Sequence, residues 1–262
     1  MFEQRALSSA VDDVRSEYAP DALVLDSERD FASLQAAQAE GLGLLVDALE
    51  PVEYPTSWLP DAVPNQLERY VREEFTIGMP EDGSVVWTRQ TDPPIVIVKP
   101  RIQGSPASFV DFLLAEAFVE LAADVPEHFL GFFEDEYRSF DEAVPLGPVD
   151  TYQIAAAVFG GWVGLHTREV YREWPTERPS LGETWQTAGS TVRKRIDDLP
   201  GAVARNETDF AAATELACSG IKHDISLPAP FDALDTAAYR DHGAAYAIRW
   251  AGKTFESLSE DG

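Results

Sequence analysis

Alternating apolar and polar positions between residues 75 and 99 predict a small antiparallel sheet. Residues 75–79 alternate with a period of two, and residues 85–91 repeat that pattern after a turn signal at 80–83. The run Ile95–Val98 then follows a pair of prolines and has no polar member. The sequence therefore predicts a three-stranded meander over residues 75–99.

Apolar residues recur at helical spacing through most of the remaining chain, and a proline-rich loop interrupts them at residues 50–65. One exception is Ala22–Leu25, a short apolar run that fits a fourth strand. We predict an α+β fold that is predominantly α-helical, a helical body carrying the small sheet. The prediction places one domain over 1–262, with a helical sub-region at 1–74, the meander at 75–101 and a second helical sub-region at 102–262.

The third predicted strand, made of Ile95, Val96, Ile97 and Val98, raises a question about partners. A strand without polar residues is typical of burial on both faces, yet the last strand of a meander is an edge. Either Ala22–Leu25 completes the sheet beside it, or the edge is an interface for a protein partner or a second copy. The first alternative is the commoner solution.

Charge dominates the composition. The 262 residues include 46 Asp and Glu against 20 Lys and Arg, for a formal net charge of −26, and the hydrophobic fraction of 45% is that of a globular protein. Only four of the basic residues are lysines. Self-repulsion of this size strains a compact fold in dilute buffer, whereas molar salt shortens the screening length to about 3 Å. We therefore interpret the carboxylates as an adaptation to concentrated salt.

Two segments of the chain have no net negative charge. Residues 69–101 and residues 151–204 each hold as many basic as acidic residues. Either these segments lie closer to the core and need fewer solvating carboxylates, or they form surfaces that meet a partner. Arg193–Arg195 is the densest basic run, but Asp197 and Asp198 follow it, and the acidity of the chain disfavours binding to a phosphate backbone.

Histidines and their polar neighbours provide the candidate chemistry. His166 and Glu169 lie three positions apart on a predicted helix, a spacing that suits an acid–base pair, although a histidine on an aromatic face is more often packed in the core. A second group of polar residues, Tyr239, His242 and Arg249, lies on the predicted last helix and suits the binding of a small anion. The alternative is that these residues form a polar seam between packed helices. The candidate ligand-binding residues are His166, Glu169, Arg89, Tyr239, His242 and Arg249.

Complete catalytic motifs and metal-ligand spacings are missing from the sequence. No two histidines share the spacing of a zinc site, and Cys218 is the only cysteine, which fits a small core residue. We therefore predict no catalytic residues, no metal and no cofactor. The sequence also has no secretory signal and no apolar run of about 18–20 residues, so we expect a cytoplasmic protein without membrane spans.

The composition and the stretches 85–91, 209–218 and 239–250 resemble an uncharacterised haloarchaeal family of unknown function. The resemblance implies an archaeal cytoplasm rich in salt and carries no catalytic residues with it. Three functions are open. The first is a non-enzymatic binding or assembly protein, the second an enzyme or ligand-binding protein with a pocket between helices and sheet, and the third a nucleic-acid-associated factor using Arg193–Arg195.

Overall fold

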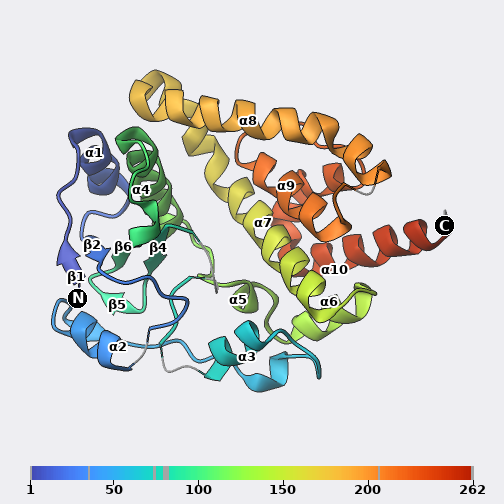
Figure 1. Ribbon diagram of the computed structural model, residues 1–262, viewed down its shortest axis with the longest axis horizontal. Coiled ribbons are helices and arrows are strands. Elements are labelled where there is room, and N and C mark those ends of the chain that lie inside the picture. Colours follow the sequence, from blue (N-terminus) through green and yellow to red (C-terminus); the bar gives the residue numbers. More distant parts are fainter. Residues whose placement is uncertain (1, 35, 73–74, 79–82, 206, 261–262) are drawn as a thin grey trace. The chain divides into compact units, whose positions relative to one another are not determined.

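The structure is a computed structural model that describes residues 2–34, 36–72, 75–78, 83–205 and 207–260 (Figure 1). Within these ranges the chain forms ten α-helices and two β-sheets, which confirms an α+β fold dominated by helices. It divides into two compact units. Unit 1 comprises Met1–Tyr54, Asn65–His128 and Trp174–Thr184, and unit 2 comprises Pro55–Pro64, Phe129–Glu173 and Trp185–Gly262. The single domain expected over 1–262 stays a prediction.

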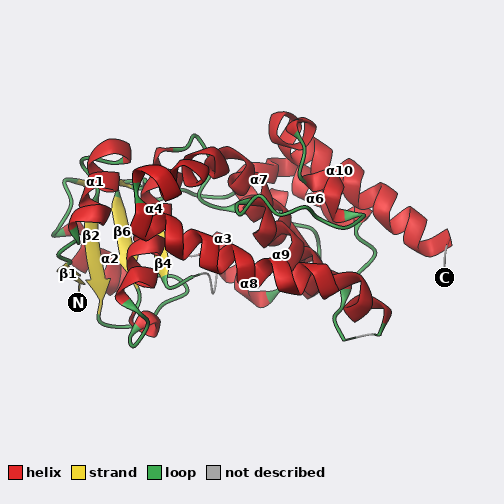
Figure 2. Ribbon diagram, turned by 90° about the horizontal axis from the view of Figure 1, so that it is seen from above, coloured by secondary structure: helices red, strands yellow, loops and turns green. Residues whose placement is uncertain are grey.

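A mixed four-stranded sheet lies at the centre of unit 1. Its strands are β1 (Phe2–Gln4), β2 (Leu23–Ser27), β6 (Ile95–Val98) and β4 (Val85–Thr88), in that spatial order (Figure 2). Strand β6 pairs in parallel with β2 and antiparallel with β4. All four β6 residues are buried, which explains why this strand lacks polar residues.

The predicted meander is therefore wrong in part. The described residues 75–78 form no strand, and residues 79–82, which include most of the predicted turn, lie outside the described residues. Phe75 and Ile77 are buried in a loop whose side chains join the core, so their alternation reflected burial without pairing. The predicted strand over 85–91 divides into β4 and a second piece, β5 (Thr91–Asp92), which pairs with β3 (Ala48–Leu49).

The fourth strand expected at 22–25 is confirmed as β2. Every residue of β6 pairs with a residue of β2. Ile95, Val96, Ile97 and Val98 therefore do not form an open edge. The sheet closes on this side inside the chain, which is the first of the two alternatives, and the alternative of an open edge does not hold. The buried residues of β6 hold no free surface for a partner.

Both faces of the sheet are covered by apolar side chains within unit 1. Leu25, Ile95 and Ile97 pack against the chain that follows β2, including α2 (Ala36–Gly43). On the opposite face α4 (Ala107–Ala122) packs against β4 and β6, and α1 (Ser9–Tyr18) packs against α4 (Figure 1). Helix α3 (Asn65–Arg72) completes the unit's own helices.

The N-terminal region differs from the expected helical sub-region 1–74. Helix α1 begins only after Ser8, whose side chain accepts a hydrogen bond from the Val11 backbone N–H at 3.4 Å, and residues 2–4 form β1 instead. Strands β2 and β3 also fall inside this sub-region. Ser27 ends β2. Short strands of two to five residues carry too little periodicity to be distinguished from helix ends.

Every regular element described after residue 102 is helical. Helices α7 (Pro148–Glu177) and α8 (Pro179–Ala204) contribute to both units. The remaining helices of unit 2 are α5 (Phe129–Phe133), α6 (Tyr137–Ala143), α9 (Phe210–Ile221) and α10 (Ala237–Glu260), with short 3-10 helices η1 (Thr56–Trp58), η3 (Glu134–Glu136) and η4 (Phe231–Leu234). A further 3-10 helix, η2 (Pro100–Ile102), precedes α4 in unit 1.

Helix α10 is interrupted at Gly243. This residue has φ 46° and ψ −125°, a conformation that side chains with a Cβ rarely adopt. A Cβ at this position would lie 3.2 Å from the Phe132 ring and 3.6 Å from Trp162 Nε1. Trp162 also donates a hydrogen bond to the Arg240 carbonyl at 3.1 Å, so α7 holds the interruption in place.

Replacing Gly243 with alanine is expected to lower the free energy of unfolding by about 1–3 kcal/mol, because the left-handed backbone is strained for alanine and the Phe132 ring is close. Gly252→Ala is the matched control on the same helix. Its Cβ meets nothing within 4 Å, so helix propensity should raise stability by about 0.5–1 kcal/mol. Urea unfolding of both variants measures the difference, and equal effects would contradict the assigned interruption.

Candidate functional site

The six candidate ligand-binding residues are distributed over both units. Arg89 lies in unit 1, directly after β4. The other five lie in unit 2, two on α7 and three on α10. Their role in binding a ligand stays a prediction, and their surroundings show what each one does in the fold.

Arg89 caps the carboxyl end of α4. Its guanidinium donates hydrogen bonds to the carbonyls of Leu121 at 3.0 Å and Val125 at 2.8 Å, and it also reaches the Ala123 carbonyl. The same group lies 4.9 Å from the centroid of the Trp87 ring. A cation at the carboxyl end of a helix compensates the partial negative charge of the last carbonyls. These contacts assign Arg89 a structural role.

The Glu127 carboxylate lies next to this cap and is half-buried. It accepts hydrogen bonds from the Thr88 hydroxyl at 2.8 Å, the Arg89 backbone N–H at 2.5 Å and the Gln90 side-chain amide at 2.8 Å. Burial raises the pKa of Glu127, and the three donors oppose that increase. The carboxylate thereby fixes the segment that joins β4 to β5.

Gln90 extends the same network. Its amide N–H also donates to the Thr76 carbonyl at 2.7 Å, and its side-chain oxygen accepts from the Val52 N–H at 2.9 Å. One buried side chain therefore connects three segments that are far apart in the sequence. A fully bonded buried polar network of this kind rigidifies its surroundings.

His128 follows Glu127 and is completely buried. Its ring stacks on Tyr70 with centroids 4.2 Å apart and lies 5.6 Å from the Tyr54 ring. Burial lowers the pKa of His128 to about 3, so the imidazole is neutral over the ordinary pH range. Burial and the nearby Glu127 raise the pKa of Tyr54. The consecutive Glu and His were the only sequence signal for this cluster.

In unit 2, His166 and Glu169 are both exposed on α7, so the core position considered for His166 is wrong. The His166 ring lies 4.3 Å from the Trp162 ring, one helical turn away. Glu169 pairs with Arg172 at 2.6 Å and lies 3.8 Å from Arg168. The carboxylate of the expected acid–base pair is therefore engaged by arginines.

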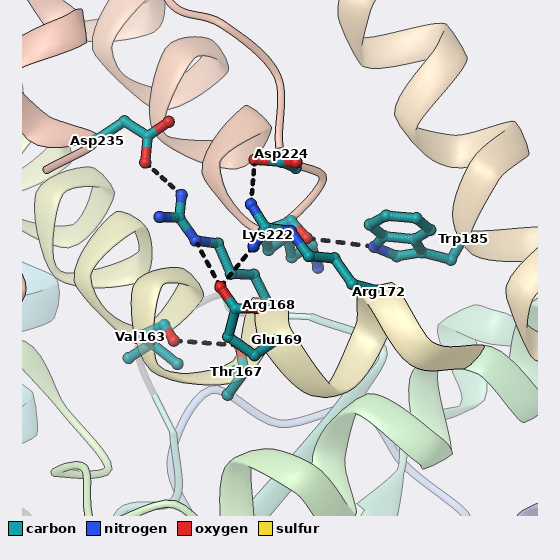
Figure 3. A network of polar contacts seen from close by, with 9 residues as sticks. All are labelled: Val163, Thr167, Arg168, Glu169, Arg172, Trp185, Lys222, Asp224 and Asp235. Carbon is teal, nitrogen blue, oxygen red and sulfur yellow. Dashed lines mark hydrogen bonds and ion pairs between the residues drawn. The ribbon is translucent and has the colours of Figure 1, made fainter. Parts of the chain in front are cut away.

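These arginines belong to the polar network of Figure 3. Arg168 pairs with Asp235, and Arg172 pairs with Asp224 at 2.5 Å. The hydrogen bond with Asp224 raises the pKa of Arg172. Both aspartates lie in the segment between α9 and α10, so the ion pairs attach that segment to α7 (Figure 3). Arg168 and Arg172 each pair with an aspartate, so these two arginines stabilise the fold.

The three candidates on α10 differ in exposure. Tyr239 is completely buried, and its hydroxyl donates to the Val158 carbonyl of α7 at 2.7 Å. Burial raises its pKa. His242 and Arg249 are exposed, and Arg249 lies 5.8 Å from the Tyr246 ring centroid. Only Tyr239 thus belongs to a polar seam between helices.

Across the described part of the chain, no group of three or more His, Cys, Asp or Glu side chains is placed to hold a metal ion. Cys218 is buried, and burial raises the pKa of its thiol. No helix in these described ranges is long and apolar enough to cross a membrane. Several large apolar side chains are exposed in the described ranges, and three of them follow α2 within nine residues: Leu44, Leu45 and Val52. The others are Phe109, Leu146, Val149, Val203 and Leu258.

These features define an α+β protein held together by buried polar contacts. A model of a family of unknown function, DUF7089, matches residues 1–258, and the chain belongs to this family. Neither the curated proteins nor the solved structures contain a match to the chain.

We predict that His128 makes stability depend on pH. Its pKa is about 3 in the fold and about 6.5 when exposed, so the unfolded chain binds the proton first as the pH falls. Stability from this group is complete above about pH 6.5 and declines by about 1.4 kcal/mol per pH unit towards pH 3. His128→Phe should flatten the pH dependence of urea unfolding relative to the unmodified chain. At pH 8 the histidine is neutral in the folded and in the unfolded chain, so the difference in unfolding free energy between the two proteins reports only the change in packing. If the unfolding free energies of the two proteins changed equally with pH, the prediction would be contradicted.

Proposed function

We propose that this protein is a non-enzymatic binding and assembly protein that associates with a second copy of itself. The observation that supports this proposal is the exposure of Leu44, whose relative accessibility is 87%. Leu45 and Val52 are exposed at 42% and 46%. We call residues 44–52 the apolar segment. Large exposed apolar side chains that occur together are a common feature of protein-binding surfaces.

The backbone of the apolar segment is held firmly. The Asp47 N–H donates to the Asp92 carbonyl at 2.6 Å, and the Glu50 N–H donates to the Gln90 carbonyl at 2.8 Å. The Val52 N–H adds the bond to the Gln90 side chain described above. The Leu45 N–H donates to the Leu42 carbonyl at 2.8 Å, so the backbone is hydrogen-bonded on both sides of Val46, which lowers the entropic cost of binding.

Charge favours a second copy as the occupant. Two molecules of net charge −26 repel each other, so they approach most easily through a surface that has few charges. Glu40 is the only charged residue between 31 and 46, the stretch that leads into the apolar segment, and the segment itself holds two exposed carboxylates, Asp47 and Glu50, whose repulsion concentrated salt screens. The partner contact expected at Ile95–Val98 is assigned to the apolar segment instead, because those four residues are buried.

The acidity supports a second part of the proposal, that the protein is halophilic and works in concentrated salt. Raising KCl from about 0.1 M to about 1 M shortens the screening length from about 10 Å to about 3 Å. We expect this change to raise the melting temperature, since screening relieves repulsion in the folded state. Sucrose at the same osmolality is the control, because it is excluded from the protein surface but does not screen charge. Equal stability in dilute buffer would refute the adaptation.

The assembly proposal predicts a dimer in dilute solution at about 1 M salt, where repulsion is screened. Light scattering should give twice the chain mass of 28.8 kDa. Leu44→Glu combined with Leu45→Glu should give the mass of one chain, because both side chains are exposed and their charge opposes contact.

The control for this experiment is Val149→Glu, an exposed apolar position on α7 with 64% accessibility. It should leave the dimer intact, and circular dichroism should show that all variants remain folded. A single-chain mass for the unmodified protein at every concentration would overturn the proposal.

A further inference from the structure

The chain that directly follows the apolar segment covers the buried imidazole of His128. Tyr54 lies two residues after Val52, and the centroid of its ring is 5.6 Å from that of His128. Tyr70 of α3 stacks on the same imidazole at 4.2 Å, and its hydroxyl donates to the Gly78 carbonyl at 2.6 Å. Because Tyr54 is half-buried and His128 is completely buried, Tyr54 is part of the layer that separates the imidazole from solvent.

A second connection joins the apolar segment to the same place. The Val52 N–H donates to the Gln90 side-chain oxygen at 2.9 Å, and the Gln90 amide donates to Glu127 at 2.8 Å. Glu127 precedes His128 in the chain. The end of the apolar segment is therefore attached to residues 127–128 through hydrogen bonds as well as through the ring of Tyr54. Moving this part of the chain outward would loosen the cover of His128.

Proton uptake by His128 favours that movement. We call the arrangement in which Tyr54 covers His128 the closed form, and the arrangement in which residues 47–54 have moved outward the open form. Burial is the cause that lowers the pKa of His128 to about 3 in the closed form, whereas a solvated imidazole has a pKa of about 6.5. As the pH falls below about 6.5, the ratio of open to closed molecules therefore rises by up to about tenfold per pH unit.

The other ionisable groups around the imidazole differ in their effect. Glu127 opposes His128, because burial raises the pKa of this carboxyl and its protonation favours the closed form. Tyr54 stays neutral, since burial raises the pKa of its hydroxyl. Arg89 stays cationic, although burial lowers its pKa, and the exposed Asp124 acts on Arg89. His128 and Glu127 are thus the groups of this cluster whose charge changes on mild acidification.

We propose that protonation of His128 releases the apolar segment and thereby dissociates the dimer, so that assembly depends on pH. Histidine is the side chain that most often serves as a pH sensor, because its charge changes close to neutral pH. The inference rests on the proposed function in one respect, that residues 44–52 hold the dimer together. Acidification also reduces the net charge of −26, which by itself strengthens contact between copies. Dissociation on acidification would therefore oppose the general electrostatic effect.

Hydrogen exchange of the Asp47, Glu50 and Val52 amides measures the release, because all three N–H groups donate hydrogen bonds in the closed form. The experiment uses the full chain carrying Leu44→Glu and Leu45→Glu, so that dimer formation does not contribute. Protection relative to an unstructured peptide should fall by up to about tenfold per pH unit below about pH 6.5. Exchange that low concentrations of urea do not accelerate reports local opening. Protection that is independent of pH, or exchange only through global unfolding, would overturn the inference.

Two variants in the same background identify the group that takes up the proton. His128→Phe keeps a ring but cannot bind a proton, so protection should stay constant between about pH 8 and about pH 5. Glu127→Gln keeps the imidazole and removes the opposing carboxylate, so the fall should persist and be at least as steep. Constant protection in Glu127→Gln would assign the pH dependence to the carboxylate and overturn the inference. If His128→Phe does not fold, the Glu127→Gln result decides alone.

Light scattering at about 1 M KCl tests the effect on assembly with Leu44 and Leu45 restored. Acidification should lower the mass of the unmodified chain towards that of one chain, and His128→Phe should keep the dimer. A dimer that persists while the amides of the apolar segment lose protection would contradict the inference. A single-chain mass at every pH overturns the proposed dimer, and the hydrogen-exchange measurements then still support or overturn the release, so the two proposals fail separately.

Discussion

Unit 1 depends on the burial of β6 between two strands that run in different directions relative to it. A parallel pair needs a crossover connection, because the carboxyl end of β2 lies far from the amino end of β6. Residues 28–94 form that crossover, and they supply the apolar side chains that cover one face of the sheet. The chain after β6 forms α4, which covers the other face. Four apolar residues thereby determine the placement of both layers.

A crossover of this length needs contacts at several points along it, and buried polar side chains make those contacts. Arg89 attaches the end of β4 to the last carbonyls of α4, and Glu127 accepts three hydrogen bonds from residues 88–90. Gln90 forms hydrogen bonds with the loops around residues 52 and 76. Removing one partner from such a network leaves a buried group unsatisfied, which costs more than the hydrogen bond itself contributes. The same contacts fix the backbone of the apolar segment.

The sequence predicted those parts of the fold that are determined locally. Helical periodicity over 102–262 and the apolar runs of β2 and β6 were sufficient, because each reports its own burial. Phe75 and Ile77 suggested a strand, but the loop buries Thr76 between them as well, so the alternation of apolar and polar residues did not report alternate burial. Arg89, chosen as a ligand contact, caps a helix that begins eighteen residues further along the chain, and no local pattern reveals that. Glu127 and His128 gain their shifted pKa values from tertiary burial, which the sequence does not encode in any spacing.

Strong acidity limits where this molecule can make contact. A surface covered by carboxylates repels every similar surface, and salt removes the repulsion without creating attraction. Attraction then requires either exposed apolar area or an exposed cationic group opposite a carboxylate. The apolar segment offers the first on a backbone held by hydrogen bonds. Because the apolar segment is an exception to the composition of the chain, the contact proposed there would be selective, since repulsion between carboxylates keeps the remaining surface of each copy apart.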